Sequence, residues 1–210
     1  GTTDAQPFEI RTQNSRHLRI EPSAQQFNGS PITANVTAGS SENQADPGVR
    51  GATIAGGGAP FGASDPDFDG ETPNLVLDHY GSIGGGYGNQ AGDGDADFTN
   101  GAFATIGGGK NNQASAQIST IAGGFLNIAG GDASVIVGGT NNRAFGAAAA
   151  VLGGDSNRAV GDHSSVGGGL GNTALGGLSH VSSGTGNCSG APQSWAGGLR
   201  VKVRPGAGST

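Results

Sequence analysis

The sequence predicts an all-β fold, a parallel β-solenoid built from coils of about 15 residues, and three observations support this. Glycine is unusually frequent, with 44 of 210 residues, while only 33% are apolar. Branched aliphatic residues recur at a fixed spacing, and an asparagine follows each of them six residues later. Disorder, which a glycine-rich composition also favours, does not keep two residue columns in register, whereas stacked repeat units do. The two columns are Ile106, Ile121, Ile136, Val151, Val166 and Val181, and Asn112, Asn127, Asn142, Asn157, Asn172 and Asn187.

The first part of each repeat has the pattern of a short strand. A small residue stands two positions before each aliphatic, while the residues three and one positions before it vary freely. Side chains alternate between the two faces of a strand, so the small and aliphatic residues are expected to face the inside of the coil and the other two the outside. The inward small residues are Ala104, Ser119, Ser134, Ala149, Ser164 and Ser179.

The second part of each repeat predicts two tight corners around another short strand. Glycine pairs or triplets such as Gly107-Gly108-Gly109 follow the aliphatic, and glycine permits the positive φ and close backbone approach that a narrow corner needs. The asparagine tolerates the left-handed region and can bond the backbone of its own turn. A small residue two positions later is expected to point inward again, and the second corner usually falls at a glycine. These small residues are Ala114, Ala129, Ala144, Ala159, Ala174 and Ser189, and the corner glycines are Gly131, Gly146, Gly161 and Gly176.

Earlier coils are visible but interrupted, which gives the predicted organisation of the chain. Ile83 with Asn89 forms one coil, Ile54 starts another, and a degenerate coil runs from Val36 through residues 43–45. Insertions near residues 59–79 and 93–100 are expected at corners, where a stack tolerates extra chain. Residues 1–50 are thus predicted to hold a β-hairpin cap and the degenerate coil, 51–190 the β-roll repeats, and 191–210 a C-terminal strand and tail.

Two recurring segments carry a family resemblance. Residues 104–109 (ATIGGG) and 142–146 (NRAFG) resemble the head repeats of YadA-like trimeric autotransporter adhesins, which combine a small-x-aliphatic-x-Gly strand with an Asn-x-Ala-x-Gly turn. The resemblance covers roughly residues 50–190. It implies a left-handed parallel β-roll, a side-by-side homotrimer, and display on a bacterial cell surface. The 15-residue coil with its glycine triplet departs from the adhesin pattern, so host-binding activity does not follow from the resemblance.

The flanking segments resemble a second group of proteins. Residues 1–11 and 194–200 are similar to bacterial and phage proteins in which such a roll precedes a self-cleaving C-terminal chaperone, as in tail spikes. This resemblance implies a location on a virion tail as the alternative to the bacterial cell surface.

Charge and hydropathy narrow the range of partners. The net charge is −6 and the ten lysines and arginines are scattered, which argues against nucleic acid as a partner. No run of 18 apolar residues is present, so no membrane insertion by this segment is expected. The apolar content of each coil is low, and self-association is therefore expected to bury additional surface.

Alternating aspartates in the two insertions make them candidate calcium loops. They are Asp65, Asp67 and Asp69 in the first insertion and Asp93, Asp95 and Asp97 in the second. Hard oxygen ligands in this spacing are typical of the first half of a calcium loop. Neither insertion has the bidentate glutamate of loop position 12, which would fall on Val76 and Ala104, so a solvated acidic loop is the alternative interpretation. No other cofactor is expected.

A catalytic site is not expected. His163 and His180 fall on outward positions of consecutive coils, and His79 lies near the end of the first insertion. Residue identity at outward positions changes from coil to coil, and no Gly-x-Ser-x-Gly elbow is present. Surface or interface histidines are the preferred interpretation.

Three functions remain, in order of preference. The first is a non-enzymatic, trimeric adhesive module that binds an unknown surface glycan or protein ligand through exposed coil positions and insertion loops. The second is a shaft segment of a phage-type tail fibre or spike. The third, least favoured, is a polysaccharide-acting enzyme on a β-solenoid.

Overall fold

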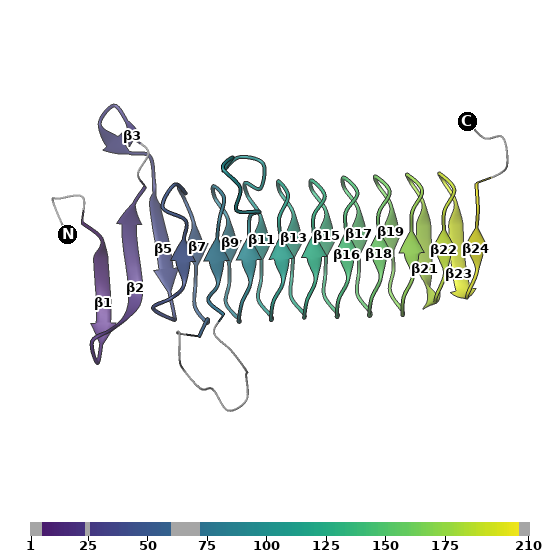
Figure 1. Cartoon of the computed structure of the whole chain (residues 1–210), viewed down its shortest axis with the longest axis horizontal. Helices are drawn as coiled ribbons and strands as arrows, with labels where there is room; N and C mark the ends of the chain where they lie inside the picture. The colour runs from purple at the N-terminus through teal and green to yellow at the C-terminus, as the bar shows by residue number, and fades with distance from the viewer. Residues whose placement is uncertain (1–5, 24–25, 60–71, 206–210) are drawn as a thin grey trace.

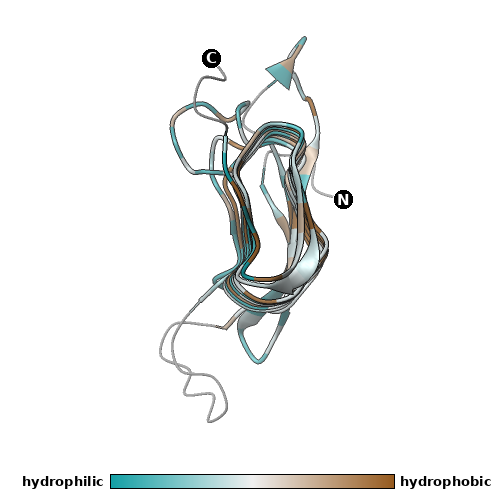
Figure 2. Cartoon of the chain, turned by 90° about the vertical axis from the view of Figure 1, so that its right-hand side faces the viewer, coloured by the Kyte–Doolittle hydropathy of each residue, from teal (hydrophilic) through white to brown (hydrophobic). Residues whose placement is uncertain are grey.

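The computed structural model describes residues 6–23, 26–59 and 72–205, and all helix or strand assignments in these ranges are β-strand. Ten coils follow one another along one axis as a parallel β-solenoid, with the two ends of the coil stack far apart (Figure 1). Viewed along the axis, the coils superpose as one flattened ring (Figure 2). The predicted all-β solenoid with a 15-residue period is therefore confirmed. The described residues include no helix long and apolar enough to cross a membrane.

Two large sheets form the long walls of the ring. The first sheet contains, in spatial order, β1 (Phe8–Thr12), β2 (Ser15–Pro22), β5 (Ala34–Ala38), β7 (Thr53–Ile54), β9 (Ser82–Ile83), β11 (Thr105–Ile106), β13 (Thr120–Ile121), β15 (Val135–Ile136), β17 (Ala150–Val151), β19 (Ser165–Val166), β21 (His180–Thr185) and β23 (Trp195–Leu199). The second sheet contains β24 (Lys202–Val203), β22 (Cys188–Ser189), β20 (Thr173–Ala174), β18 (Arg158–Ala159), β16 (Arg143–Ala144), β14 (Ile128–Ala129), β12 (Gln113–Ala114), β10 (Gln90–Ala91), β8 (Leu75–Val76) and β6 (Gln44–Ala45). A separate hairpin pairs β3 (Gln26–Phe27) with β4 (Ser30–Pro31). Each coil thus places one short strand in each wall.

The predicted aliphatic column forms the core. Ile121 pairs with Ile136, and Ile136 pairs with Val151, in unbroken parallel register. All six members of the column are fully buried, as are the alanines that face them from the second sheet. Each coil therefore contributes one branched side chain and two or three small ones to the core. Burial of one such aliphatic side chain contributes about 1.5–3 kcal/mol, so the core of a single coil is thin.

The predicted asparagine column forms a buried hydrogen-bonded ladder. The backbone N–H of Asn157 donates to Oδ1 of Asn142 at 3.0 Å, and the side-chain Nδ2 of Asn157 donates to the carbonyls of Gly153 and Gly169, both at 2.9 Å. The same set of bonds recurs from coil to coil, for example at Asn127 and at Asn172. The side chain thus bonds its own turn, as predicted, and also connects neighbouring coils. At Asn157 it bonds the carbonyl of Gly153 and adds a second donor to the carbonyl of Gly169, which also accepts the backbone N–H of Asp155.

The corners differ from the predicted geometry in two respects. The residue three positions before each aliphatic was predicted to lie in the strand, but Ile118 has φ 59° and Ala133 has φ 54°. The strand therefore begins two residues later, and the earlier residue closes the second corner in the left-handed region. At the first corner the left-handed residue is the one before the ladder asparagine, with φ 52° at Asn141. The ladder asparagine, which tolerates the left-handed region, does not adopt it here; its side chain points inward and joins the ladder.

The early coils also shift relative to the prediction. Thr37, rather than Val36, pairs with Ile54 and occupies the aliphatic position of the first coil. Asn74 joins the ladder, because its backbone N–H donates to Oδ1 of Asn43 at 2.9 Å. Residues 74–76 therefore belong to a coil, and the insertion predicted near 59–79 ends before them. A further coil at the C-terminal end places Ala196, 1% exposed, above Val181.

Candidate binding surfaces

From β7 to β23 the outer surface of the first sheet carries no formal charge. We define the uncharged face as the outward positions immediately before and after the core residue in the nine coils from β7 to β23. None of these positions holds Asp, Glu, Lys or Arg, and several hold exposed apolar side chains, among them Leu152 at 59% and Trp195 at 66% exposure. The pairs are Thr53/Ala55, Ser82/Gly84, Thr105/Gly107, Thr120/Ala122, Val135/Val137, Ala150/Leu152, Ser165/Gly167, His180/Ser182 and Trp195/Gly197.

The outer surface of the second sheet is different. We define the arginine face as the outward positions that flank the buried alanine column on β14, β16, β18 and β20. Arg143 and Arg158 are directly paired in the parallel register, so two like charges lie on adjacent coils. Phe145, 40% exposed, and Leu175, 48% exposed, lie in the neighbouring outward column. The 15-residue separation of the two arginines is visible in the sequence, but the sequence analysis did not connect it with a site.

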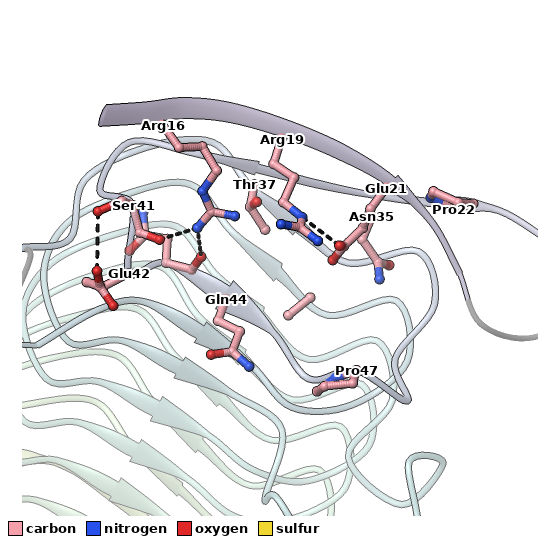
Figure 3. Close-up of a pocket in the computed structure, with 12 residues that line it drawn as sticks. Arg16, Arg19, Glu21, Pro22, Asn35, Thr37, Ser41, Glu42, Gln44 and Pro47 are labelled. Atoms are coloured by element: carbon pink, nitrogen blue, oxygen red, sulfur yellow. Dashed lines mark hydrogen bonds and ion pairs between the residues drawn. The ribbon is translucent and has the colours of Figure 1, made fainter. Parts of the chain in front are cut away.

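A pocket of about 350 Å³ lies between β2 and the first coil (Figure 3). Arg16 projects from β2 and donates through Nη2 to the carbonyls of Ser41 and Asn43, the latter at 3.0 Å. In later coils the equivalent asparagine carbonyl accepts an N–H from the preceding coil, as Asn112 accepts from Gln90. Arg16 therefore supplies the donor that a preceding coil would provide. Its guanidinium caps the N-terminal end of the stack and is already hydrogen-bonded to these two carbonyls.

The second arginine of this pocket is also engaged. Nε of Arg19 donates to Glu21 at 2.6 Å, and its Nη1 donates to Glu9 at 3.2 Å. The pocket therefore joins the β1–β2 hairpin to the roll, and its two cations are held by protein acceptors. We assign it a structural role at the N-terminal end.

The two acidic insertions leave the roll at opposite corners. The first connects β7 to β8, and its predicted ligands Asp65, Asp67 and Asp69 lie outside the described residues. The second connects β10 to β11 and projects from the roll in Figure 1. The described residues that flank the two insertions thus lie at different corners of the roll.

The carboxylates of the second insertion brace their own loop. Asp93, Asp95 and Asp97 each accept a backbone N–H from the residue two positions later, at 3.0, 2.6 and 3.0 Å. Nδ2 of Asn100 donates to Oδ2 of both Asp93 and Asp95, at 3.1 and 2.9 Å. Across the described ranges, no group of three His, Cys, Asp or Glu side chains is arranged to hold a metal ion. Calcium binding stays a prediction from the sequence pattern.

The base of the second insertion contains two buried titratable groups. The ring of His79 stacks on Phe98 with centroids 5.6 Å apart. Burial lowers the pKa of His79, and the positive charge of Arg50 lowers it further, while Asp97 has the opposite effect. Burial also raises the pKa of the neighbouring Asp78, whose Oδ2 accepts the N–H of Asp93 at 2.9 Å. His79 was predicted near the end of an insertion; it lies instead at a regular corner, against the loop of the second insertion.

The other two histidines do not form a common site. His163 lies at the second corner with φ 57°, whereas His180 lies on the uncharged face. Nδ1 of His180 lies 2.8 Å from Oγ of Ser165, which belongs to the adjacent coil. No carboxylate among the described residues is bonded to the His180 ring, and the backbone N–H groups of both residues bond the next coil. The His180–Ser165 pair therefore has no carboxylate that would orient the histidine ring as in a catalytic triad. The backbone N–H groups of these two residues are already bonded and cannot stabilise an oxyanion.

Comparisons with known proteins add no family to these observations: no family model and no curated protein matches the chain. Its function must therefore be argued from the fold and from its surfaces.

Proposed function

We propose that this chain is a non-enzymatic structural and adhesive β-roll that assembles as a homotrimer outside the cell, with the uncharged face turned toward its neighbours. The observation that carries the proposal is the absence of charge over nine successive coils of one sheet. Interface cores are depleted of charged residues, whereas a solvated sheet face normally carries polar and charged side chains. The left-handed coil and the number of three chains follow the resemblance to YadA-like heads.

The dimensions of the face indicate which surfaces must take part. Nine coils at a strand spacing of about 4.8 Å give a strip roughly 40 Å long, but only three residues wide. A stable interface buries about 800 Å² on each partner, which is more than so narrow a strip supplies alone. Exposed apolar side chains at the second corner extend the strip, among them Phe103 at 51%, Ile118 at 56% and Leu178 at 58% exposure. A side-by-side arrangement that includes this corner would bury the additional surface.

The mass in solution tests the assembly. Light scattering should give three times the chain mass of 20.3 kDa. A Leu152→Glu substitution on the uncharged face should dissociate the assembly, because it places a carboxylate in an apolar interface. Leu175→Glu makes the same change on the arginine face and should leave the mass unchanged. A monomeric wild-type chain would refute the proposal.

The only tryptophan of the chain provides a second readout. Trp195 is 66% exposed in the single chain, and assembly through the uncharged face would shield it. Its fluorescence emission should therefore lie at a shorter wavelength in wild type than in a dissociated Leu152→Glu variant. Equal emission in the two proteins would place the interface elsewhere.

A shaft segment of a tail fibre or spike is the second candidate, and the regularity of the asparagine ladder favours it. The same bonds recur from coil to coil over much of the roll, as a rigid spacer requires. The two functions differ in ligand binding, which a spacer does not need. Binding of the isolated trimer to a glycan array or to whole cells would favour the adhesive function.

A further inference from the structure

The arginine face carries two positive charges that have no counter-ion among the described residues. Arg143 and Arg158 are directly paired on β16 and β18, and like charges in register destabilise a sheet. The ion pairs of Glu9 and Glu21 lie in the N-terminal hairpin, and among the described residues neither Arg143 nor Arg158 forms an ion pair. Both guanidinium groups are therefore available to an anion from outside the chain.

The acidic residues nearest to Arg158 in the sequence are hydrogen-bonded to other groups. Asp155 accepts a hydrogen bond from Ser156 Oγ at 2.6 Å. Asp162 accepts the backbone N–H of Ala147 at 3.0 Å and braces the second corner. An external anion would thus relieve the repulsion between the two arginines without competing for these carboxylates.

An apolar column runs beside the two arginines. Phe145 lies over Gly130, where an added Cβ atom would be 3.0 Å from the phenyl ring. The ring is 40% exposed, and Leu175 two coils further on is 48% exposed. A ligand that contacts both columns needs anionic groups along one edge and an apolar surface along the other.

From this geometry we propose that Arg143 and Arg158, with Phe145 beside them, bind a linear acidic polysaccharide that lies along the axis of the roll. Guanidinium groups bind carboxylate and sulfate oxygens in bidentate fashion. The coil spacing of about 4.8 Å is close to the length of one sugar residue in an extended chain, so successive anionic groups would meet successive arginines. The C–H face of a pyranose ring would pack on the phenyl ring. The inference rests on the proposed adhesive function and specifies its ligand class.

Binding to defined oligosaccharides tests the proposal. The probes are an oligogalacturonate, a heparin-derived oligosaccharide, a neutral maltodextrin of the same length, and a poly-glutamate peptide, each titrated calorimetrically into the assembled protein at low salt. Wild type should bind at least one acidic oligosaccharide, with affinity that falls as salt rises, and should not bind maltodextrin. Carboxylate and sulfate ligands share this chemistry, and the first two probes distinguish between them.

Matched variants identify the binding residues. Arg143→Gln/Arg158→Gln should weaken binding about a hundredfold, the equivalent of losing one charge-assisted hydrogen bond at each of the two arginines. Lys110→Gln/Arg200→Gln removes the same charge at the first corner and should bind like wild type. Phe145→Ala should weaken the binding of acidic oligosaccharide, because the sugar ring loses its contact with the phenyl ring. If poly-glutamate binds at all, Phe145→Ala should weaken that binding less. The melting temperature of each variant confirms that it is folded.

Each remaining outcome decides against the inference. Binding of poly-glutamate alone would indicate an acidic protein partner, and equal effects of the two double variants would indicate non-specific charge attraction. A wild-type protein that binds neither acidic oligosaccharide would also refute it. Light scattering on the same samples distinguishes failure of this inference from failure of the proposed trimer. A trimer that binds no acidic glycan would refute the acidic polysaccharide as ligand and would leave the proposed assembly intact.

Discussion

The backbone N–H of Asn157 donates to Oδ1 of Asn142 at 3.0 Å, and each asparagine is fully buried. This contact joins two coils through one side chain, while Nδ2 of Asn142 bonds the carbonyls of Gly138 and Gly154, both at 2.9 Å. One amide group therefore forms hydrogen bonds with three backbone groups on three different residues. The requirement for an acceptor and a donor at fixed positions explains why asparagine, and no other residue, recurs here.

Replacement of Asn142 by alanine should destabilise the roll by about 3 kcal/mol, because three backbone groups lose a buried partner. Asn142→Asp should destabilise it more, since a carboxylate cannot donate to the two glycine carbonyls and burial penalises its charge. Urea unfolding measures both effects. Asn141→Gly is the matched control and should change little, because glycine tolerates the φ of 52° and occupies the same place at Gly171 and Gly186. Equal stability of Asn142→Ala and wild type would refute the role of the ladder.

Gly139→Ala should destabilise the roll by at least about 2 kcal/mol. Its φ is +89°, and an added Cβ would lie 2.2 Å from the carbonyl oxygen of Gly154. Gly123→Ala provides the control, because nothing lies within 4 Å of an added Cβ at that position. Both variants replace a glycine by alanine, so the difference between their unfolding midpoints measures the effect of the strained backbone and the steric clash at Gly139. Similar midpoints would show that the coils can separate enough to accept a methyl group.

Arg16→Met should lower stability by about 1–2 kcal/mol, because the carbonyls of Ser41 and Asn43 lose their donor at the open end of the stack. Arg11→Met removes an arginine of the same hairpin whose ion pair with Glu9 is exposed, and should have a smaller effect. Hydrogen exchange of the first coil is the suitable measurement, since local fraying precedes global unfolding in repeat proteins. Unchanged exchange in Arg16→Met would rule out the capping role.

Acidification should destabilise the coil around His79. Its pKa in the folded state is lowered by burial, whereas the unfolded chain takes up a proton near pH 6.5, at about the ordinary pKa of histidine. Stability is therefore retained above this pH and lost as the pH falls toward the folded-state pKa. His79→Gln should reduce the loss in urea unfolding between about pH 7.5 and 5.5.

Asp78 acts in the opposite direction in a lower pH range. Burial raises its folded-state pKa, so its charge opposes folding near neutral pH, and protonation relieves that cost as the pH falls through the raised pKa. Asp78→Asn should therefore be more stable than wild type near neutral pH, provided that its amide oxygen keeps the bond from Asp93 N–H. An acid response of His79→Gln identical to that of wild type would show that other groups govern the pH dependence.

The periodic positions made most of the roll predictable. In the regular coils the isoleucine or valine, alanine and asparagine columns share one spacing, so the period determines the parallel register as well as the fold. The two-residue strands were harder to predict, because the left-handed residues at the corners include Ile118 and Ala133, which have no intrinsic preference for that conformation. The stack imposes the conformation on them through backbone bonds between coils.

The early coils and the surfaces were less predictable for a different reason. Thr37 stands where later coils have isoleucine or valine, and Asn74 is separated from Ile54 by an insertion, so neither matches the spacing. The pairing of Arg143 with Arg158 follows from the period, but its significance depends on the absence of a carboxylate partner among the described residues. That property depends on three-dimensional packing and cannot be read from spacing.

The repetition of one bond set along the asparagine ladder also bears on how such a gene changes. A recombination event that adds or removes one whole repeat leaves every remaining donor opposite an equivalent acceptor, since each coil presents the same atoms above and below. A duplication of any other size keeps the ladder only if its extra residues leave the coil at a corner, as the second insertion does between Asn89 and Asn112. The length of the rod can therefore vary between relatives in whole coils, while the surfaces that contact partners are kept.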